Sequence, residues 1–259
     1  EIRLSLVGSE MCIRDRHLPH PSHASVLAVA GGRGRVGPQP FWHRYDPFVR
    51  SDRTPEIGDS DQRMKSKLVV FDLAGTTVRD TNTVGGALQA ALAEIGVVAS
   101  VAEVNAVMGI PKPVAIAQIL AAHGTAGDVN TIHARFQSLM IEIYRTDPGI
   151  DEIEGATDVM QILKATGLKI AVDTGFDRAI TDVVIGRMPW RDLIDDSIAS
   201  DEVAHGRPAP DMLFALAERQ GVAPSEIVKV GDTPSDIQEG RAAGAGLVVG
   251  VLYGTHTRE

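Results

Sequence analysis

The sequence predicts an α/β protein: a Rossmann-like parallel sheet core with an inserted small helical cap domain. From Met64 onward, short apolar runs alternate with segments whose apolar residues recur every three to four positions. That alternation is typical of a parallel sheet with helical crossovers. A long helical stretch also separates the first two expected strands, which predicts an insertion rather than one continuous domain.

Five strands are expected, each a short apolar run bounded by polar or turn-forming residues. They are Lys67–Asp72, Leu168–Asp173, Asp196–Ser200, Ile227–Gly231 and Leu247–Val251. Most of the helices expected between them end near a glycine, as helix C-termini often do. These helices are Ala156–Thr166, Arg178–Arg187, Asp211–Gln220 and Ser235–Ala243.

The insertion is expected at residues 80–149, with the core formed by residues 64–79 and 150–259. Four segments in it carry apolar residues at i, i+3 and i+4, the spacing of an amphipathic helix. They are Val84–Ile95, Val101–Val107, Pro113–His123 and Val129–Tyr144. Because the insertion directly follows the first strand, we expect it to cover an active site at the end of that strand.

Residues 1–63 differ in kind, with nine arginines, six prolines and no lysine. They show no sustained helix or strand period, and residues 4–16 resemble a peptide that arises when sequencing-adapter DNA is translated by mistake. We therefore expect residues 1–63 to be a non-native or disordered extension. A basic arm and a targeting peptide are the alternatives.

Composition excludes several classes of function. The chain has 259 residues, 44% of them hydrophobic, and a net charge of −9, which disfavours a nucleic-acid partner. No apolar run approaches the roughly 20 residues that cross a bilayer, so no membrane partner is expected. Cys12 is the single cysteine, so no intrachain disulfide can form. We expect a cytoplasmic protein.

Four short motifs follow the ends of expected strands or precede a helix. They are Asp72-x-Ala74-Gly75-Thr76-Thr77, Thr174-Gly175, Gly206-Arg207-Pro208-Ala209-Pro210-Asp211 and Gly231-Asp232-Thr233-Pro234-Ser235-Asp236. Each alone is a weak signal, since an aspartate at a strand end is commonly a cap or turn residue and an arginine is commonly solvated. Together they indicate one site, because ligands bind at the carboxyl ends of parallel strands.

The chemistry of these motifs converges on phosphoryl transfer. An aspartate such as Asp72 can accept a phosphoryl group as an acyl phosphate, which divides one difficult step into two. Asp72, Asp232 and Asp236 would place three negative charges together, and Mg²⁺ is the hard cation suited to neutralising them. The groups suited to binding the phosphoryl oxygens are Thr174, Gly175 and Arg207.

The residue two positions after Asp72 is Ala74. A phosphoryl-accepting aspartate usually has a carboxylate there to protonate the leaving group, a contribution of about 10²–10⁴-fold. The chain therefore keeps the expected nucleophile and lacks the usual acid.

At these motifs the chain resembles the haloacid dehalogenase superfamily, from Met64 to about Gly254. Within it, the chain is similar to the phosphonatase family, that is, phosphonoacetaldehyde hydrolase and its relatives. The narrower similarity rests on Ala74, on Gly-Arg-Pro-Ala-Pro at 206–210, and on Met108-Gly109-Ile110-Pro111-Lys112.

The resemblance implies that Lys112 forms a Schiff base with a substrate aldehyde. It also implies a homodimer built largely through the caps. Further roles that it implies are substrate or phosphate binding by Gly75, Thr76 and Met108, and metal binding by the backbone carbonyl of Ala74.

Ala74 and Lys112 support each other as evidence for cleavage of a C–P bond. Cleavage beside an aldehyde expels a carbanion, and an iminium on Lys112 can absorb that charge as an enamine. The leading hypothesis is therefore an Mg²⁺-dependent hydrolase of a small phosphonate aldehyde. For such chemistry the lysine must be unprotonated, which requires desolvation or a nearby cation.

Two positions depart from the phosphonatase pattern: Ala115 stands where that family has histidine, and Phe176 stands where it has tyrosine. One alternative is a phosphatase of a small phosphorylated metabolite, with Lys112 binding only substrate charge. A second is a non-catalytic binding module. Apart from the resemblance, Lys112 could also be an exposed lysine between Pro111 and Pro113.

Overall fold

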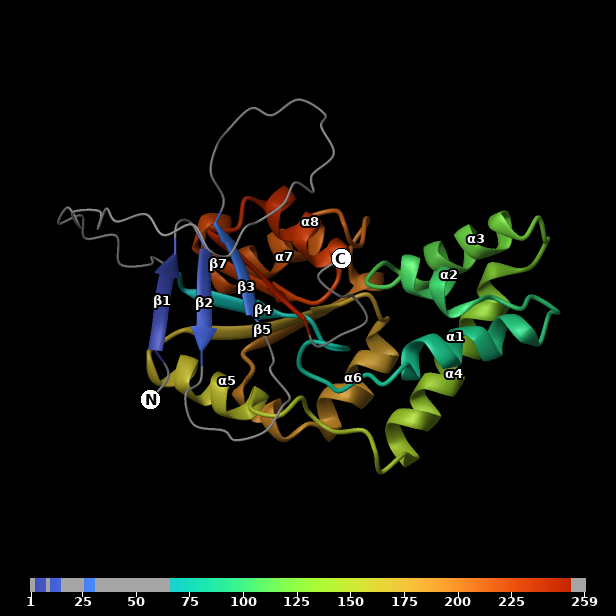
Figure 1. Cartoon of the computed structure of the whole chain (residues 1–259), viewed down its shortest axis with the longest axis horizontal. Helices are drawn as coiled ribbons and strands as arrows, with labels where there is room; N and C mark the ends of the chain where they lie inside the picture. The colour runs from blue at the N-terminus through green and yellow to red at the C-terminus, as the bar shows by residue number, and fades with distance from the viewer. Residues whose placement is uncertain (1–2, 8–9, 15–25, 31–65, 253–259) are drawn as a thin grey trace. The chain divides into compact units, whose positions relative to one another are not determined.

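The computed structural model describes residues 3–7, 10–14, 26–30 and 66–252 (Figure 1). Five parallel strands form a sheet in the order β8-β7-β4-β5-β6. Their bounds are β4 Leu68–Phe71, β5 Lys169–Thr174, β6 Asp196–Ala199, β7 Ile227–Gly231 and β8 Leu247–Val251. Each agrees with the expected strand to within one residue at either end, and the predicted fold class is confirmed.

The helices of the described residues also fall where the apolar spacing predicts them. In the insertion they are α1 Thr83–Ala93, α2 Val101–Ala106, α3 Lys112–Ala122 and α4 Val129–Thr146. In the core they are α5 Ala156–Ala165, α6 Arg178–Arg187, α7 Asp211–Gln220 and α8 Pro234–Ala243. Short 3₁₀ turns occur at Pro189–Leu193, Ser200–Glu202 and Pro224–Glu226.

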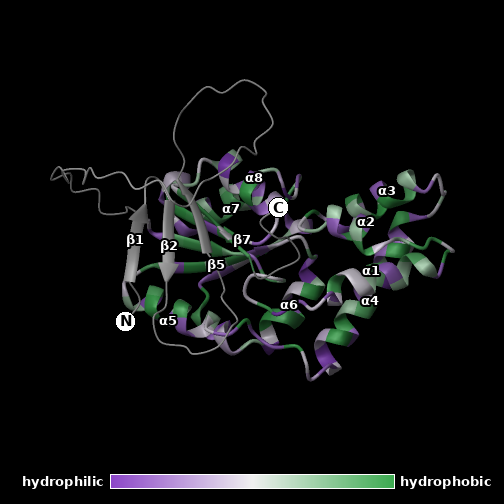
Figure 2. Ribbon diagram, viewed as in Figure 1, coloured by the Kyte–Doolittle hydropathy of each residue, from purple (hydrophilic) through white to green (hydrophobic). Residues whose placement is uncertain are grey.

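Helices cover both faces of the parallel sheet. Successive side chains of a strand point to opposite faces, and in β4 the side chains of Val69 and Phe71 join the cluster that includes residues of α5 and α6. The side chains of Leu68 and Val70 join the cluster with α7 and α8. Figure 1 shows the two helix pairs on opposite sides of the sheet, and Figure 2 shows the largely apolar strands between them.

Four helices, α1 to α4, form the insertion between β4 and β5. Helix α4 buries Ile132, Phe136, Met140 and Tyr144, which follow one another at intervals of four residues and so lie on one face. This face packs against α1, α3 and α6, which joins the insertion to the core. Core and insertion belong to one compact unit.

One helix boundary matters for the site, because α3 begins at Lys112 rather than at Pro113. Proline is tolerated in the first helical turn, where its missing N–H has no intrahelical partner to lose. Lys112 therefore lies at the N-terminus of a helix and not in a free linker.

Three antiparallel strands continue the sheet beyond β8. They are β1 Arg3–Val7, β2 Glu10–Arg14 and β3 Val26–Ala30, and β3 pairs with β8. The sequence predicts that residues 1–63 are a non-native or disordered extension. A short apolar stretch at 26–30 can satisfy the backbone groups that an edge strand such as β8 would leave unpaired. Residues 1–2, 8–9, 15–25 and 31–65 lie outside the described residues, and the non-native origin of residues 1–63 stays a prediction.

The described residues contain no helix that combines the length and the hydropathy needed to cross a bilayer.

Candidate active site

Asp72 directly follows β4 and is held by a tight turn. The Leu73 carbonyl accepts hydrogen bonds from the backbone N–H groups of Thr76, Thr77 and Val78. Gly75 makes this turn possible with φ of 90°, a left-handed conformation that side chains disfavour. The Asp72 carboxyl group is consequently buried at the carboxyl edge of the sheet.

One pocket brings core and insertion residues together at this edge. The core contributes residues at the ends of three strands and also Arg207, and the insertion contributes residues around the start of α1, the segment before α3 and the first residue of α3. The lining residues are Asp72, Ala74, Asp80, Val84, Met108, Gly109, Lys112, Thr174, Gly175, Phe176, Arg207, Asp232 and Thr233. Parallel register explains the core part, because Phe71 pairs with both Val172 and Val230.

The insertion reaches the core through close backbone contact. Gly109 has φ of 80°, and a Cβ atom there would lie 2.3 Å from the Thr233 side-chain oxygen. A Cβ atom on Gly175 would lie 3.0 Å from the carbonyl oxygen of Ile110. The absence of side chains at Gly109 and Gly175 therefore allows the segment before α3 to lie against the strand ends.

Arg207 is fully buried, which excludes the solvated arginine considered from the sequence. Its Nη1 lies 2.7 Å from Asp72 Oδ1 and 2.8 Å from Asp236 Oδ1, and its Nε donates to Glu239 Oε2 at 3.1 Å. Its Nη2 contacts the Asp173 carboxylate and donates to the Asp173 carbonyl at 2.8 Å. These carboxylates hold the guanidinium group in one orientation beside Asp72.

Lys229 is a second buried cation beneath the site. Its Nζ contacts Asp173 and lies 3.0 Å from Asp236 Oδ1 and 3.4 Å from Glu239 Oε2. Burial and the nearby Arg207 oppose its charge, but these three carboxylates raise the pKa of Lys229 above its usual value. The ammonium therefore occupies the centre of the Asp173, Asp236 and Glu239 cluster.

Negative charge exceeds positive charge in this buried network. Asp72, Asp173, Asp236 and Glu239 face the two cations Arg207 and Lys229. Burial, with repulsion from Asp173, raises the pKa of Glu239 to about 8. Burial raises the pKa of Asp72 to about 6, although Arg207 opposes the shift. An additional cation near Asp72 would favour its ionised form.

The carboxylates of Asp72, Asp232 and Asp236 fit a hard divalent cation. Oxygen atoms of all three lie within 4.8 Å of one another, and all three residues are buried. Asp236 uses Oδ2 to cap α8, where it accepts from the Thr233 N–H at 3.1 Å. Thr76 Oγ1 donates to Asp232 Oδ1 at 3.3 Å. Carboxylate oxygens at a phosphoryl site are the ligands that Mg²⁺ prefers.

Lys112 is buried in the pocket, with 3% of its surface exposed, so it is not an exposed linker residue. Its Nζ lies 5.6 Å from the centre of the Phe176 ring and within 3.5 Å of the Ile110 carbonyl oxygen. Burial lowers the pKa of Lys112 to about 8, with Asp72 opposing and Arg207 assisting the shift. The dipole of α3 also disfavours a positive charge at its N-terminus.

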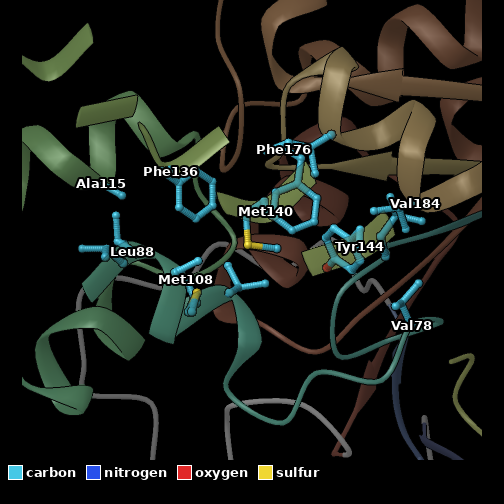
Figure 3. Packing of buried hydrophobic residues seen from close by; sticks show 14 of the residues in the cluster. Val78, Leu88, Met108, Ala115, Phe136, Met140, Tyr144, Phe176 and Val184 are labelled. Atoms are coloured by element: carbon cyan, nitrogen blue, oxygen red, sulfur yellow. The ribbon is translucent and has the colours of Figure 1, made fainter. Parts of the chain in front are cut away.

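The two positions that depart from the phosphonatase pattern both belong to the apolar core, and Phe176 also lines the pocket. Ala115 is fully buried in α3, and Phe176 is buried beside Tyr144 (Figure 3). The Phe176 and Tyr144 rings meet edge to face with centroids 6.0 Å apart. His123 and His133 do not replace the missing histidine, because neither lines the pocket.

The structure brings most of the predicted site residues to one pocket. Asp72, Ala74, Met108, Lys112, Thr174, Gly175, Arg207 and Asp232 all line it. Gly75, Thr76 and Asp236 do not line it. Two of them contact residues that do line it: Thr76 contacts Asp232, and Asp236 contacts Arg207.

Sequence reasoning missed four charged residues of this region: Asp80, Asp173, Lys229 and Glu239. Lys229 interrupts the apolar run of β7, and the structure buries every residue of that strand. Asp173 directly precedes Thr174 at the end of an expected strand, and in the structure it contacts both buried cations. Asp80 and Glu239 carry no comparable local signal.

A family model described as haloacid dehalogenase-like hydrolase matches residues 66–244. The chain is 30% identical to the phosphonoacetaldehyde hydrolase of one Bacillus cereus strain over 212 residues, covering 74% of this chain and 78% of that protein. It is 35% identical to that of another Bacillus cereus strain over 136 residues, covering 51% of this chain and 49% of that protein. The chain thus spans about half the length of the first curated relatives that it matches.

A solved structure described as a phosphonoacetaldehyde hydrolase like protein from Oleispira antarctica superposes with a TM-score of 0.62. The two chains are 22% identical, and the match covers 70% of this chain and 71% of the other. At this identity the likeness establishes the fold alone.

Proposed function

The chain belongs to the haloacid dehalogenase-like hydrolase family, and on this premise we propose that it is an Mg²⁺-dependent, phosphonatase-like hydrolase. Its proposed substrate is a small phosphonate aldehyde, similar to phosphonoacetaldehyde, whose C–P bond it breaks. The observation that supports this most directly is the burial of Lys112 in the same pocket as Asp72. The names of the curated relatives agree with it.

Lys112 would begin the reaction as an amine. With its pKa lowered to about 8, an appreciable fraction of the side chain is unprotonated near neutral pH. The free amine adds to the substrate aldehyde and, with loss of water, forms an iminium. The Phe176 ring faces Lys112 Nζ and carries no hydroxyl group that could hydrogen-bond to the amine.

Asp72 would then attack phosphorus. As the Asp72 oxygen bonds to phosphorus, the electron pair of the C–P bond passes into the iminium and gives an enamine on Lys112. The leaving carbon needs no proton in this step, because the iminium accepts its electron pair. The step therefore does not require an acid at position 74. Protonation of the enamine and hydrolysis of the imine release the dephosphorylated aldehyde, and water cleaves the phosphoaspartate.

Phosphoryl binding would be shared between the core motifs. Thr174 and Gly175 line the pocket and would offer a hydroxyl group and a backbone N–H, and Arg207 is oriented by its carboxylate partners. Mg²⁺, held by Asp72, Asp232, Asp236 and the Ala74 carbonyl, would neutralise charge on the phosphoryl oxygens.

Hydrolysis of a small phosphate ester is the second candidate. It is favoured by Ala115 and Phe176, which lack the imidazole and hydroxyl groups of the phosphonatase pattern. It is disfavoured by Ala74, because an ester expels an alkoxide that needs a proton.

Reduction with borohydride in the presence of phosphonoacetaldehyde tests the proposal. We expect a stable adduct on Lys112, identified by peptide mass spectrometry, and release of phosphate when reductant is omitted. Lys112→Arg should abolish both, whereas Asp72→Asn should abolish phosphate release and keep the adduct. Turnover of phosphate esters without any adduct would favour the second candidate.

The homodimer and the cytoplasmic location stay predictions. Analytical ultracentrifugation of the purified chain tests the first, with a mass near 55 kDa, about twice that of one chain, expected for the dimer.

A further inference from the structure

Asp80 is a pocket residue for which the proposed reaction has so far assigned no role. It follows the turn after β4 and precedes α1, at the junction of core and insertion. Its Oδ1 accepts hydrogen bonds from the N–H groups of Thr83 at 2.6 Å and Val84 at 3.4 Å. Both of these bonds go to Oδ1, and the backbone of Asn82 also hydrogen-bonds to the Asp80 carboxyl group.

Asp80 and Lys112 influence each other across the pocket. They line the same cavity, and each shifts the titration of the other. Burial raises the pKa of Asp80, while the capping N–H groups and Lys112 oppose the shift. Tyr144 of α4 also senses Asp80, since burial and then Asp80 raise the pKa of that phenol. The carboxyl group therefore holds its proton to higher pH than an exposed aspartate.

Imine formation needs such a group. The amine adds to the aldehyde to give a carbinolamine, and its hydroxyl leaves as water only if it receives a proton. Ala74 and Ala115 supply none. Of the other carboxylates that line the pocket, Asp72 is the nucleophile and Asp232 faces the proposed metal position. Asp80 is the pocket carboxyl that remains.

We propose that Asp80 transfers the protons for imine formation and hydrolysis at Lys112. This inference rests on the proposed function. The Asp80 carboxyl group donates its proton to the carbinolamine hydroxyl. The C–O bond breaks, water leaves, and the nitrogen lone pair forms the iminium beside the new carboxylate. When water later attacks the product iminium, the carboxylate takes one proton from that water, and the cycle closes.

If Asp80 acted only through its negative charge, neutralising it would have the opposite effect on the rate of imine formation. Its negative charge raises the pKa of Lys112. Removing that charge alone would leave more free amine at neutral pH and make imine formation faster. Slower imine formation after neutralisation of Asp80 therefore requires a proton-transfer role.

Asp80→Asn is the decisive variant, because asparagine keeps a carbonyl oxygen that can cap α1 and loses the carboxyl proton. The measurement is the rate at which borohydride traps phosphonoacetaldehyde on Lys112, followed by mass spectrometry at pH 7. We expect trapping to slow by about 10²-fold. Asp128→Asn is the matched control, since Asp128 caps α4 by accepting from the Asn130 N–H at 3.2 Å and is not among the pocket residues. It should trap at the rate of the unmodified protein.

The outcomes separate the two ideas. If the unmodified protein traps the aldehyde and Asp80→Asn traps it equally fast or faster, the role of Asp80 is wrong while the proposed function stands. If the unmodified protein forms no adduct, the proposed function itself fails and the role of Asp80 falls with it. Asp80→Ser, also a good helix cap, repeats the test if the asparagine variant does not fold.

Discussion

Replacing Lys229 with methionine should strongly destabilise the fold, although Lys229 does not line the pocket. Its side chain is fully buried, and its ammonium contacts three carboxylates that no water can solvate. Methionine has a similar length and no charge. The variant would leave Arg207 as the one cation for the four buried carboxyl groups in the network described above.

Breaking a buried ion pair by removing one partner typically costs about 3–5 kcal/mol. That is a large share of the roughly 5–15 kcal/mol by which proteins are stable. With a urea m-value of about 2 kcal/mol/M, the unfolding midpoint of Lys229→Met should fall by about 1.5–2.5 M. This loss of stability should be smaller at acid pH, because protonation of a buried carboxyl group reduces the excess of negative charge around Arg207.

The assay is urea unfolding followed by circular dichroism at pH 5 and pH 8, with a chelator present so that metal binding does not contribute. Lys67→Met is the matched control, because Lys67 pairs with Glu226 at 2.8 Å but its side chain is 61% exposed. An exposed pair contributes about 0–1 kcal/mol. A midpoint for Lys229→Met no lower than that of the control, with the same difference at both pH values, would refute the reasoning.

Three further predictions follow from the site. An NMR titration of the Lys112 side chain should have its midpoint near pH 8, because burial lowers this pKa; a midpoint near that of a free lysine would contradict the buried amine. Gly109→Ala should destabilise the protein by about 1–3 kcal/mol and raise KM, because its Cβ atom would lie 2.3 Å from Thr233 Oγ1. Its control, Gly86→Ala, meets no neighbouring atom and should be neutral or stabilising in urea unfolding. Glu239→Gln should be tolerated at pH 7, because burial raises the pKa of Glu239 to about 8 and the group is largely neutral there. A carboxyl group whose pKa is higher in the folded than in the unfolded protein stabilises the fold fully below the unfolded-state pKa, and this stabilisation is lost as the pH rises toward 8. Between pH 5 and pH 8, the melting temperature of Glu239→Gln should therefore fall less than that of the unmodified protein.

Local pattern was sufficient for the strands and helices. Each core strand is a short buried run, and each insertion helix has an apolar stripe, so period and length identify them without knowledge of the neighbours. Boundaries were less certain where proline intervenes. The pattern placed the start of α3 after Lys112, whereas the helix includes it.

The site was predictable where parallel topology alone brings residues together. Asp72, Thr174 and Asp232 each lie at or just after the end of a strand of the same sheet, so their proximity follows from the fold class. Lys229 was missed because a lysine in a strand is ordinarily solvated, and only the packing of α8 and the neighbouring carboxylates shows that it is buried.

The sequence by itself determined the fold class, the four motifs and the substitution of alanine for the usual acid at position 74. Only the tertiary structure decided how far Lys112 and Asp80 are removed from solvent and in which direction their pKa values shift. The burial of Lys112 and the partial burial of Asp80 depend on how closely the insertion approaches the strand ends, which Gly109 and Gly175 permit. Desolvation, and with it the pKa of each group, depends on atoms from distant parts of the chain, and no local pattern contains that information.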